Sequence, residues 1–253
     1  MKVGIVNYLN TLPLLYGLEH SSLASRIELI KDYPARIAAL LENGQIDIGL
    51  IPVASLPQIP KGQLIADFGI ASDGPVASVG LLSQAPLEDI EEVLLDYQSK
   101  TSVALLQILL EHHWKKSVRL IPGEAGLEKN ISGHTAALLI GDRCLRFRSQ
   151  VNYVYDLGEA WKSFTGLPFV YAAWVSNREL PAYFIREFNQ ANAAGVKAID
   201  RILQQQSITY YDLRKYYHEN IRYALGDAER KGLSNFLALL HSHPELSPPV
   251  NHL

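Results

Sequence analysis

Short apolar runs alternate with helix-like segments from residue 3 to about residue 176, and this alternation constrains the fold more than any other feature. Apolar runs of about four to eight residues, separated by amphipathic helices, are typical of parallel strands joined by crossover helices. Strands are expected at 3–6, 26–30, 46–51, 64–70, 76–82, 93–95, 118–121, 136–140, 153–157 and 169–175. Helices are expected at 34–42, 101–114 and 159–164. The pattern predicts an α/β fold.

After Pro181 the pattern changes to helix only, without a strand signal. Three helices are expected in this part of the chain, at 183–205, 210–222 and 228–241. Helices without strands of their own must bury their apolar faces on a sheet that is already built. The first part of the chain has few helices of its own, so we expect the C-terminal helices to cover its sheet.

The chain is therefore expected to form two lobes. The first would contain residues 1–80 and 177–253, and the second residues 81–176. Crossing between lobes twice, near residues 80 and 177, is the layout of the type II periplasmic-binding-protein-like fold. Such a fold places its ligand in the cleft between lobes, where carboxyl ends of strands face amino ends of helices.

Charge and composition exclude several classes of function. The net charge is −3 and Lys and Arg do not cluster, so nucleic acid is not an expected partner. No run approaches the ~20 apolar residues that cross a membrane, and the first residues lack an export signal. We expect a cytoplasmic protein, monomer or homodimer, that binds a small molecule and no membrane.

Metal and nucleotide sites are not expected either. The single Cys144 excludes a disulfide framework and is expected in the core. His112 and His113 are adjacent on a helix and point in different directions, and His241 and His243 lack carboxylate or Cys companions. The chain has neither a dinucleotide fingerprint nor a phosphate loop, so no metal and no cofactor is expected.

Two segments carry polar groups at the starts of expected helices. In the first, at 7–14, Asn7, Asn10 and Thr11 follow a strand. Its amide and hydroxyl groups, with free backbone N–H groups, suit an orienting anion site, although Asn and Thr serve equally in turns and N-caps. The second segment, 96–102, offers three hydroxyls and a cation, which can hold a carboxylate or phosphate. These four residues are Ser99, Lys100, Thr101 and Ser102.

Two further segments lie where the chain is expected to cross between lobes. Ser78 could face the cleft from the first crossing, or lie on a solvated strand face. Thr165, Gly166 and Leu167 precede Pro168 before the second crossing, and Gly and Pro there demand a turn.

Six segments in order along residues 3–176 carry a family resemblance. They are NYLNxxPL at 7–14, GxIDxxLIP at 44–52, VASV at 76–79, LDxxSKTS at 95–102, IGD at 140–142 and DLGxxWxxxTGLPFV at 156–170. Together they resemble the chorismate dehydratases of the futalosine route to menaquinone. The family tetrad usually reads Ser-Arg-Thr-Ser. Here Lys100 keeps the charge but loses the bidentate fork of Arg.

The resemblance implies a periplasmic-binding-protein-like fold and the conversion of chorismate to 3-(1-carboxyvinyloxy)benzoate without a cofactor. We take Asn10 and Ser78 as the catalytic candidates that hold the reacting groups. The substrate-binding candidates are Tyr8, Thr11, Ser99, Lys100, Thr101, Ser102, Thr165, Gly166 and Leu167. Two anion sites suit the two carboxylates of chorismate, and donors aimed at its ring carboxylate would stabilise the developing charge.

None of the matched segments offers a His or Glu as general base. Our hypothesis is that the enolpyruvyl carboxylate of the substrate takes the proton. Asp142 is the alternative base, or a structural carboxylate. Three other functions stay open: a non-catalytic carboxylate-binding protein, the related 1,4-dihydroxy-6-naphthoate synthase, and the ligand-sensing domain of a transcription regulator.

Overall fold

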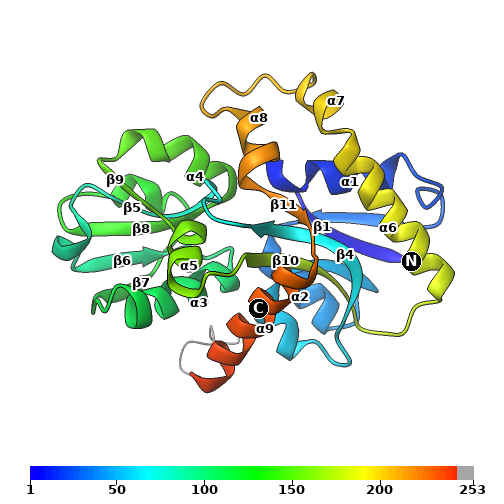
Figure 1. Cartoon of the computed structure of the whole chain (residues 1–253), viewed down its shortest axis with the longest axis horizontal. Helices are drawn as coiled ribbons and strands as arrows, with labels where there is room; N and C mark the ends of the chain where they lie inside the picture. Colours follow the sequence, from blue (N-terminus) through cyan, green and yellow to red (C-terminus); the bar gives the residue numbers. More distant parts are fainter. Residues whose placement is uncertain (244–253) are drawn as a thin grey trace.

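Two sheets of different size organise the computed structural model, which describes residues 1–243 (Figure 1). The six-stranded sheet has the order β11-β4-β10-β3-β1-β2 and the five-stranded sheet the order β7-β6-β8-β5-β9. We call each sheet with its covering helices the first and second lobe. In Figure 1 the second lobe lies on the left and the first on the right.

The strands of both sheets follow the apolar runs of the sequence. Those of the first sheet are β1 (Lys2–Val6), β2 (Glu28–Asp32), β3 (Ile48–Pro52), β4 (Gln63–Ser72), β10 (Phe169–Ser176) and β11 (Arg222–Ala224). Those of the second are β5 (Val79–Ser83), β6 (Glu92–Leu95), β7 (Arg119–Pro122), β8 (Thr135–Ile140) and β9 (Tyr153–Asp156). β1 pairs in parallel with β2 and β3, and β6 pairs in parallel with β7 and β8, as the alternation predicts.

Strand β10 corrects the expected position of the second crossing. It pairs antiparallel with β3 and β4, so residues 169–176 belong to the first sheet. The chain therefore returns between β9 and β10, ahead of residue 169, and not near residue 177. Seven of the eight β10 residues are buried, and a run that is apolar on both faces fits either sheet equally well. Only the strand pairing shows to which of the two sheets β10 belongs.

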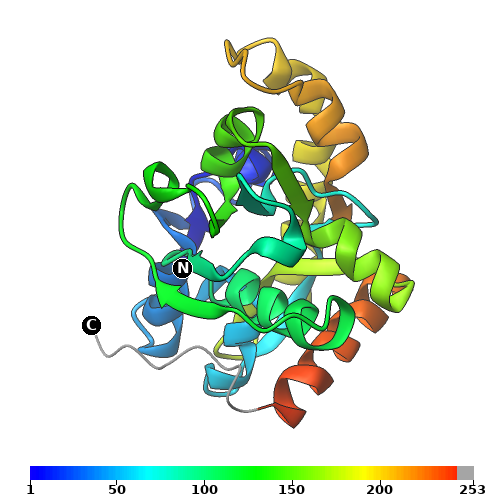
Figure 2. The same cartoon turned by 90° about the vertical axis from the view of Figure 1, so that its left-hand side faces the viewer.

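Helices cover the sheets as the C-terminal pattern predicts. The helices are α1 (Leu12–Glu19), α2 (Pro34–Glu42), α3 (Lys100–Ile108), α4 (Gly141–Phe147), α5 (Leu157–Thr165), α6 (Ala182–Lys197), α7 (Ile199–Leu203), α8 (Leu213–Lys215) and α9 (Asp227–Ser242). In the first lobe α2 packs on β1 and β3, α6 on α1 and β4, and α9 on β10. In both views α7 and α8 lie at the top and α9 at the bottom, so the C-terminal segment wraps around the first lobe (Figures 1 and 2).

The expected helix at 210–222 is wrong over most of its length. The segment contains the one-turn α8, a π-helical turn η7 (Tyr216–Asn220) and the start of strand β11, which pairs with β4 and forms an edge of the first sheet. The buried side chains of Tyr216 and Tyr217 belong to that π-helical turn, and Tyr223 is buried from β11. These aromatic residues produce a helix-like pattern in the sequence, although they belong to two different elements, η7 and β11.

An aromatic cluster joins the second crossing to the C-terminal helix. The rings of Trp161 (α5) and Phe169 (β10) meet edge to face at 5.1 Å, and Phe236 (α9) meets Phe169 at 5.0 Å. Such pairs add about 0.5–1.5 kcal/mol to the burial of their area. The cluster fixes α9 beside the segment that leads the chain back to the first lobe.

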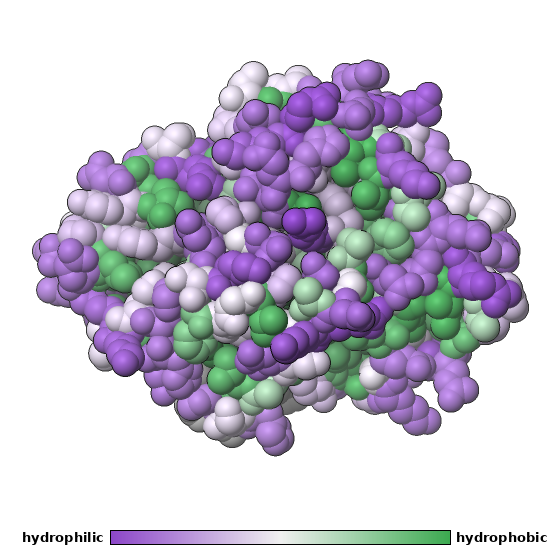
Figure 3. Space-filling model, in the orientation of Figure 1, coloured by the Kyte–Doolittle hydropathy of each residue, from purple (hydrophilic) through white to green (hydrophobic). Residues whose placement is uncertain are grey.

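The distribution of apolar residues between surface and core is that of a globular protein. Cys144 is fully buried, as expected for a core residue. On the face shown in Figure 3, apolar residues are scattered among hydrophilic ones. Among residues 1–243, no helix combines the length and the hydropathy that a membrane crossing requires.

Helices α1 and α6 touch at two glycines, and this contact sets the position of the segment before α1. A Cβ atom on Gly195 would lie 1.9 Å from the Pro13 carbonyl oxygen and 2.7 Å from the Gly17 nitrogen. Backbone atoms cannot yield as flexible side chains do, so a larger residue must separate the helices.

We expect Gly195→Ala to lower the free energy of unfolding by about 2–3 kcal/mol, because the helices must separate to admit the methyl group. Urea unfolding followed by circular dichroism measures the change. Ala194→Ser, on the exposed side of α6, is the matched control and should stay within about 0.5 kcal/mol of the parent. Equal stability of the two variants would contradict the close packing.

Candidate functional site

A pocket lies between the two lobes at the carboxyl ends of their strands. Val6, Pro52 and Ile140 are the last residues of β1, β3 and β8, and all three line it. The full lining is Val6, Tyr8, Asn10, Thr11, Pro34, Leu50, Pro52, Ile70, Val76, Ser78, Val79, Ser99, Ser102, Ile140, Gly141, Tyr171 and Ala172. An apolar pocket with a few converging polar groups is the usual form of a small-molecule site.

The pocket brings together six of the residues that the sequence singles out. They are Tyr8, Asn10, Thr11, Ser78, Ser99 and Ser102. They come from three segments: the N-terminal turn, the first crossing and the start of α3. Both lobes therefore contribute polar groups to one pocket.

The N-terminal turn is held by hydrogen bonds to its backbone. The Thr11 hydroxyl donates to the Val6 carbonyl at 2.5 Å. The phenols of Tyr217 and Tyr223 donate to the carbonyls of Leu9 at 2.8 Å and Asn10 at 2.9 Å. These two tyrosines support the turn from the C-terminal segment. No local motif around them indicates this role.

Asn10 and Ser78 each bring one buried polar side-chain atom to the pocket. Neither Asn10 Oδ1 nor Ser78 Oγ has a hydrogen-bond partner among residues 1–243. The Ser78 hydroxyl neighbours the Tyr216 phenol without hydrogen-bond geometry, and burial raises the pKa of that phenol well above its usual value. Each unpaired buried group costs about 1–3 kcal/mol, which a bound polar ligand can recover.

The start of α3 presents two hydroxyls to the pocket. Ser99 is the N-cap and accepts from the Ser102 backbone N–H at 3.2 Å, and the two hydroxyl oxygens lie 2.9 Å apart. The N-terminus of a nine-residue helix adds a partial positive charge at the same place. This arrangement favours an anionic group of a ligand.

Lys100 and Thr101 do not line the pocket but bridge the lobes. The Thr101 hydroxyl accepts from the Ala54 backbone N–H at 3.0 Å, and Lys100 Nζ donates to Gln58 Oε1 at 3.3 Å. Ala54 and Gln58 belong to the 3₁₀ helix η2 (Val53–Gln58) of the first lobe. Successive helical residues point in different directions, so only part of the Ser-Lys-Thr-Ser segment faces the pocket.

Thr165, Gly166 and Leu167 lie outside the pocket, contrary to the sequence-based expectation. The Thr165 hydroxyl donates to the Trp161 carbonyl at 2.9 Å and accepts from the Leu167 N–H at 3.1 Å. Gly166 has φ +72° and ends α5 in the left-handed conformation. The segment is the C-cap of α5, and it packs against α9 at Gly232, where a Cβ atom would lie 2.0 Å from the Pro168 carbonyl.

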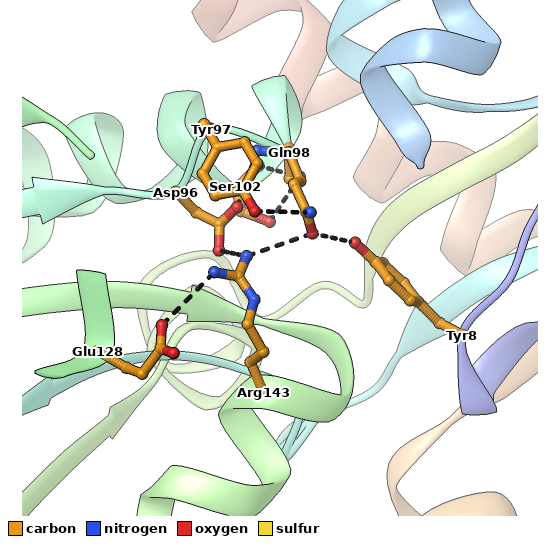
Figure 4. Close-up of polar contacts among 8 residues, drawn as sticks. Tyr8, Asp96, Tyr97, Gln98, Ser102, Glu128 and Arg143 are labelled. Atoms are coloured by element: carbon orange, nitrogen blue, oxygen red, sulfur yellow. Dashed lines mark hydrogen bonds and ion pairs between the residues drawn. The ribbon is translucent and has the colours of Figure 1, made fainter. Parts of the chain in front are cut away.

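A polar network beside the pocket links the lobes and was not expected from the sequence (Figure 4). The Tyr8 phenol donates to Gln98 Oε1 at 2.5 Å, and Arg143 donates to the same oxygen at 3.2 Å and to Asp96 at 2.6 Å. Burial raises the pKa of Asp96 to about 6, against the opposing effect of the Arg143 guanidinium. Burial also holds the pKa of Tyr8 well above its usual value, so its phenol stays a donor.

Asp142 makes a second contact between the lobes. Its carboxylate accepts from the Leu9 backbone N–H at 3.2 Å, and burial raises its pKa. The residue does not line the pocket, although its neighbour Gly141 does. Gly141 has φ +59°, and a Cβ atom there would lie 3.2 Å from the Tyr8 ring.

One group of side chains outside the pocket has metal-ligand composition. Glu111, His112 and His243 bring ligand atoms within 4.8 Å of one another, a grouping that the sequence pattern of adjacent histidines does not suggest. None of the three lines the pocket between the lobes.

Solved structures share this architecture at low identity. A crystallised protein of Archaeoglobus fulgidus has a TM-score of 0.75 at 13% identity and covers 96% of this chain and 97% of its own. The periplasmic aliphatic sulphonate binding protein of Escherichia coli has a TM-score of 0.64 at 15% identity, covering 98% and 94%. These similarities confirm the two-lobed periplasmic-binding-protein-like fold.

Sequence comparison is more specific. A chorismate dehydratase of Thermus thermophilus is 28% identical over 94% of both chains, and one of Campylobacter jejuni is 25% identical over 94% of this chain and 96% of its own. The family model described as menaquinone biosynthesis matches residues 1–242. The match includes every segment that lines the pocket, and the chain therefore belongs to the menaquinone biosynthesis family.

Proposed function

We propose that this protein is a cytoplasmic chorismate dehydratase, a lyase that removes water from chorismate to give 3-(1-carboxyvinyloxy)benzoate. Two relatives named chorismate dehydratase and the menaquinone biosynthesis family support the assignment. The observation that carries it is the pair of unpaired polar groups, Asn10 Oδ1 and Ser78 Oγ, in the pocket between the lobes. A ligand with several oxygens on a compact ring matches these groups.

Hydrogen-bond donors that line the pocket can hold the substrate carboxylates. The Ser99 and Ser102 hydroxyls at the start of α3 would hold one carboxylate. Tyr8 extends from the first lobe to Gln98 of the second in its neutral form, and it can donate to the other carboxylate if it leaves Gln98. Donors on opposite lobes would orient the ring between them.

The reaction breaks one C–H and one C–O bond and makes the ring aromatic. As the proton leaves, its electron pair delocalises toward the ring carboxylate, and a hydroxyl donor there stabilises the charge. We assign that role to Ser78, while the Asn10 amide holds the departing hydroxyl. The enolpyruvyl carboxylate takes the proton, which leaves with the hydroxyl as water. No electron acceptor is needed, because elimination of water is redox-neutral.

The direct test is incubation of the purified protein with chorismate, followed by mass spectrometry. We expect an aromatic product lighter by one water molecule. Binding of chorismate without any product would instead favour a carboxylate-binding protein. Release of 1,4-dihydroxy-6-naphthoate from a dehypoxanthine futalosine derivative would favour the related synthase.

We expect Asn10→Ala and Ser78→Ala each to lower turnover by about 10²–10³-fold, because each removes a group positioned toward the reacting atoms. The melting temperature should be retained, since neither side-chain atom has a protein partner to lose. Ser55→Ala is the matched control: its hydroxyl is also buried and unpaired but does not line the pocket. Near-normal turnover in both pocket variants would refute the assignment.

Asp142→Asn separates the two candidate bases. Asn keeps an oxygen that can accept from Leu9 N–H but cannot take a proton. If the substrate carboxylate is the base, turnover should fall by less than about tenfold, since loss of a true general base costs about 10²–10⁴-fold. Steady-state kinetics with chorismate measures the change. A loss beyond about a hundredfold would transfer the role to Asp142.

A further inference from the structure

The first crossing contains a strained turn directly before Ser78. Ala77 has φ +64°, in the region that favours glycine, and the Ser78 N–H donates to the Val76 carbonyl at 2.7 Å. This is a γ-turn of the rare, strained kind. The Ser78 carbonyl in turn accepts from the Gly141 N–H at 2.7 Å. A strained residue persists only where its surroundings hold it, and such residues gather at functional sites.

The second lobe holds this turn through both backbone groups of Ala77. The Asp156 carboxylate accepts from the N–H of Ala77 at 2.7 Å and from that of Val76 at 3.0 Å. The Ala77 carbonyl accepts from the Arg148 guanidinium at 2.6 Å and from the Cys144 thiol at 3.4 Å. Charged groups therefore bind the peptide units on either side of the strained residue, and charge-assisted hydrogen bonds are the stronger kind.

Both anchors are themselves fixed by other contacts. Asp156 is buried and caps α5, where its carboxylate also accepts from the N–H groups of Gly158 at 3.0 Å and Glu159 at 3.2 Å. The Arg148 guanidinium lies over the Tyr211 ring at 5.4 Å. Neither anchor is among the residues that line the pocket.

We propose that Asp156 and Arg148 are positioning residues, which hold Ala77 in its strained conformation and so direct the Ser78 hydroxyl into the pocket. The proposal rests on the role of Ser78 in the proposed function. Without the anchors Ala77 relaxes toward negative φ, and the peptide that precedes Ser78 rotates. A displacement of about 1 Å at a reacting group can lower the rate about a hundredfold.

Arg148→Met tests the proposal, because it keeps an apolar side chain beside Tyr211 and removes only the donors. We expect kcat to fall about 10–100-fold while KM changes less than about threefold, since the carboxylate-binding groups stay in place. Arg146→Met is the matched control. Arg146 lies two residues earlier, stacks over Tyr210 at 5.0 Å and is exposed, so its kcat should stay within about twofold.

A second substitution asks whether the loss acts through the backbone of Ala77. Glycine adopts positive φ without steric cost. We therefore expect Arg148→Met/Ala77→Gly to recover at least about fivefold in kcat over Arg148→Met. Failure of this rescue, or wild-type kcat in Arg148→Met while Ser78→Ala is impaired, would overturn the proposal. An Asp156 variant is less informative, because that carboxylate also caps α5.

Hydrogen–deuterium exchange tests the positioning role independently of enzyme activity. Peptides that cover residues 76–79 should exchange about tenfold faster in Arg148→Met than in the parent or in Arg146→Met. Unchanged exchange would overturn the proposal even if activity falls. If exchange accelerates but Ser78→Ala retains full turnover, the anchors hold the turn as described, and the role given to Ser78 in the proposed function is the part that fails.

Discussion

The insertion of β10 between β3 and β4 is the pairing on which the remaining architecture depends. β10 runs antiparallel to both neighbours, and its register places Phe169 opposite Ser72, the last residue of β4. The chain therefore leaves the first sheet and returns to it at adjacent points. The two crossings lie side by side, and the pocket forms where they meet. Tyr171 and Ala172 of the same strand line its wall.

Around the pocket the backbone is held by hydrogen bonds, whereas two polar side-chain atoms are left free for a ligand. The backbone of the N-terminal turn is fixed by Tyr217, Tyr223 and Asp142, and that of the first crossing by Asp156 and Arg148. These segments carry Asn10 Oδ1 and Ser78 Oγ into the pocket, and both atoms are left without protein partners among residues 1–243. Rigid backbone with unpaired polar side chains is the condition for preorganised binding.

The sequence predicts much of the fold, because burial imposes a periodicity that can be read locally. The sequence-based prediction misses β11, because three residues are too few for a strand pattern. It also misses the sheet to which β10 belongs, because an apolar run fits either sheet. These are questions of pairing, which depends on residues distant in the chain.

The pocket is predicted in part for the same reason. Segments after strand ends converge at the cleft between the two sheets, so Asn10 of the first lobe and Ser99 of the second could be placed near each other. Helix phase decides that Lys100 and Thr101 face η2, and the Thr165 turn is a helix cap. Contacts such as Tyr8 with Gln98 join segments that only the folded chain brings together.

The hydrogen bonds from Tyr217 and Tyr223 to the N-terminal turn span 208 and 213 residues. On the ribosome the turn is among the first segments made, and its partners are among the last. At about 5–20 residues per second, it waits roughly 10–40 seconds for them. The second sheet comes from one continuous stretch, β5 to β9, and can form during that interval. The order of synthesis thus keeps the pocket unfinished until nearly the whole chain has emerged.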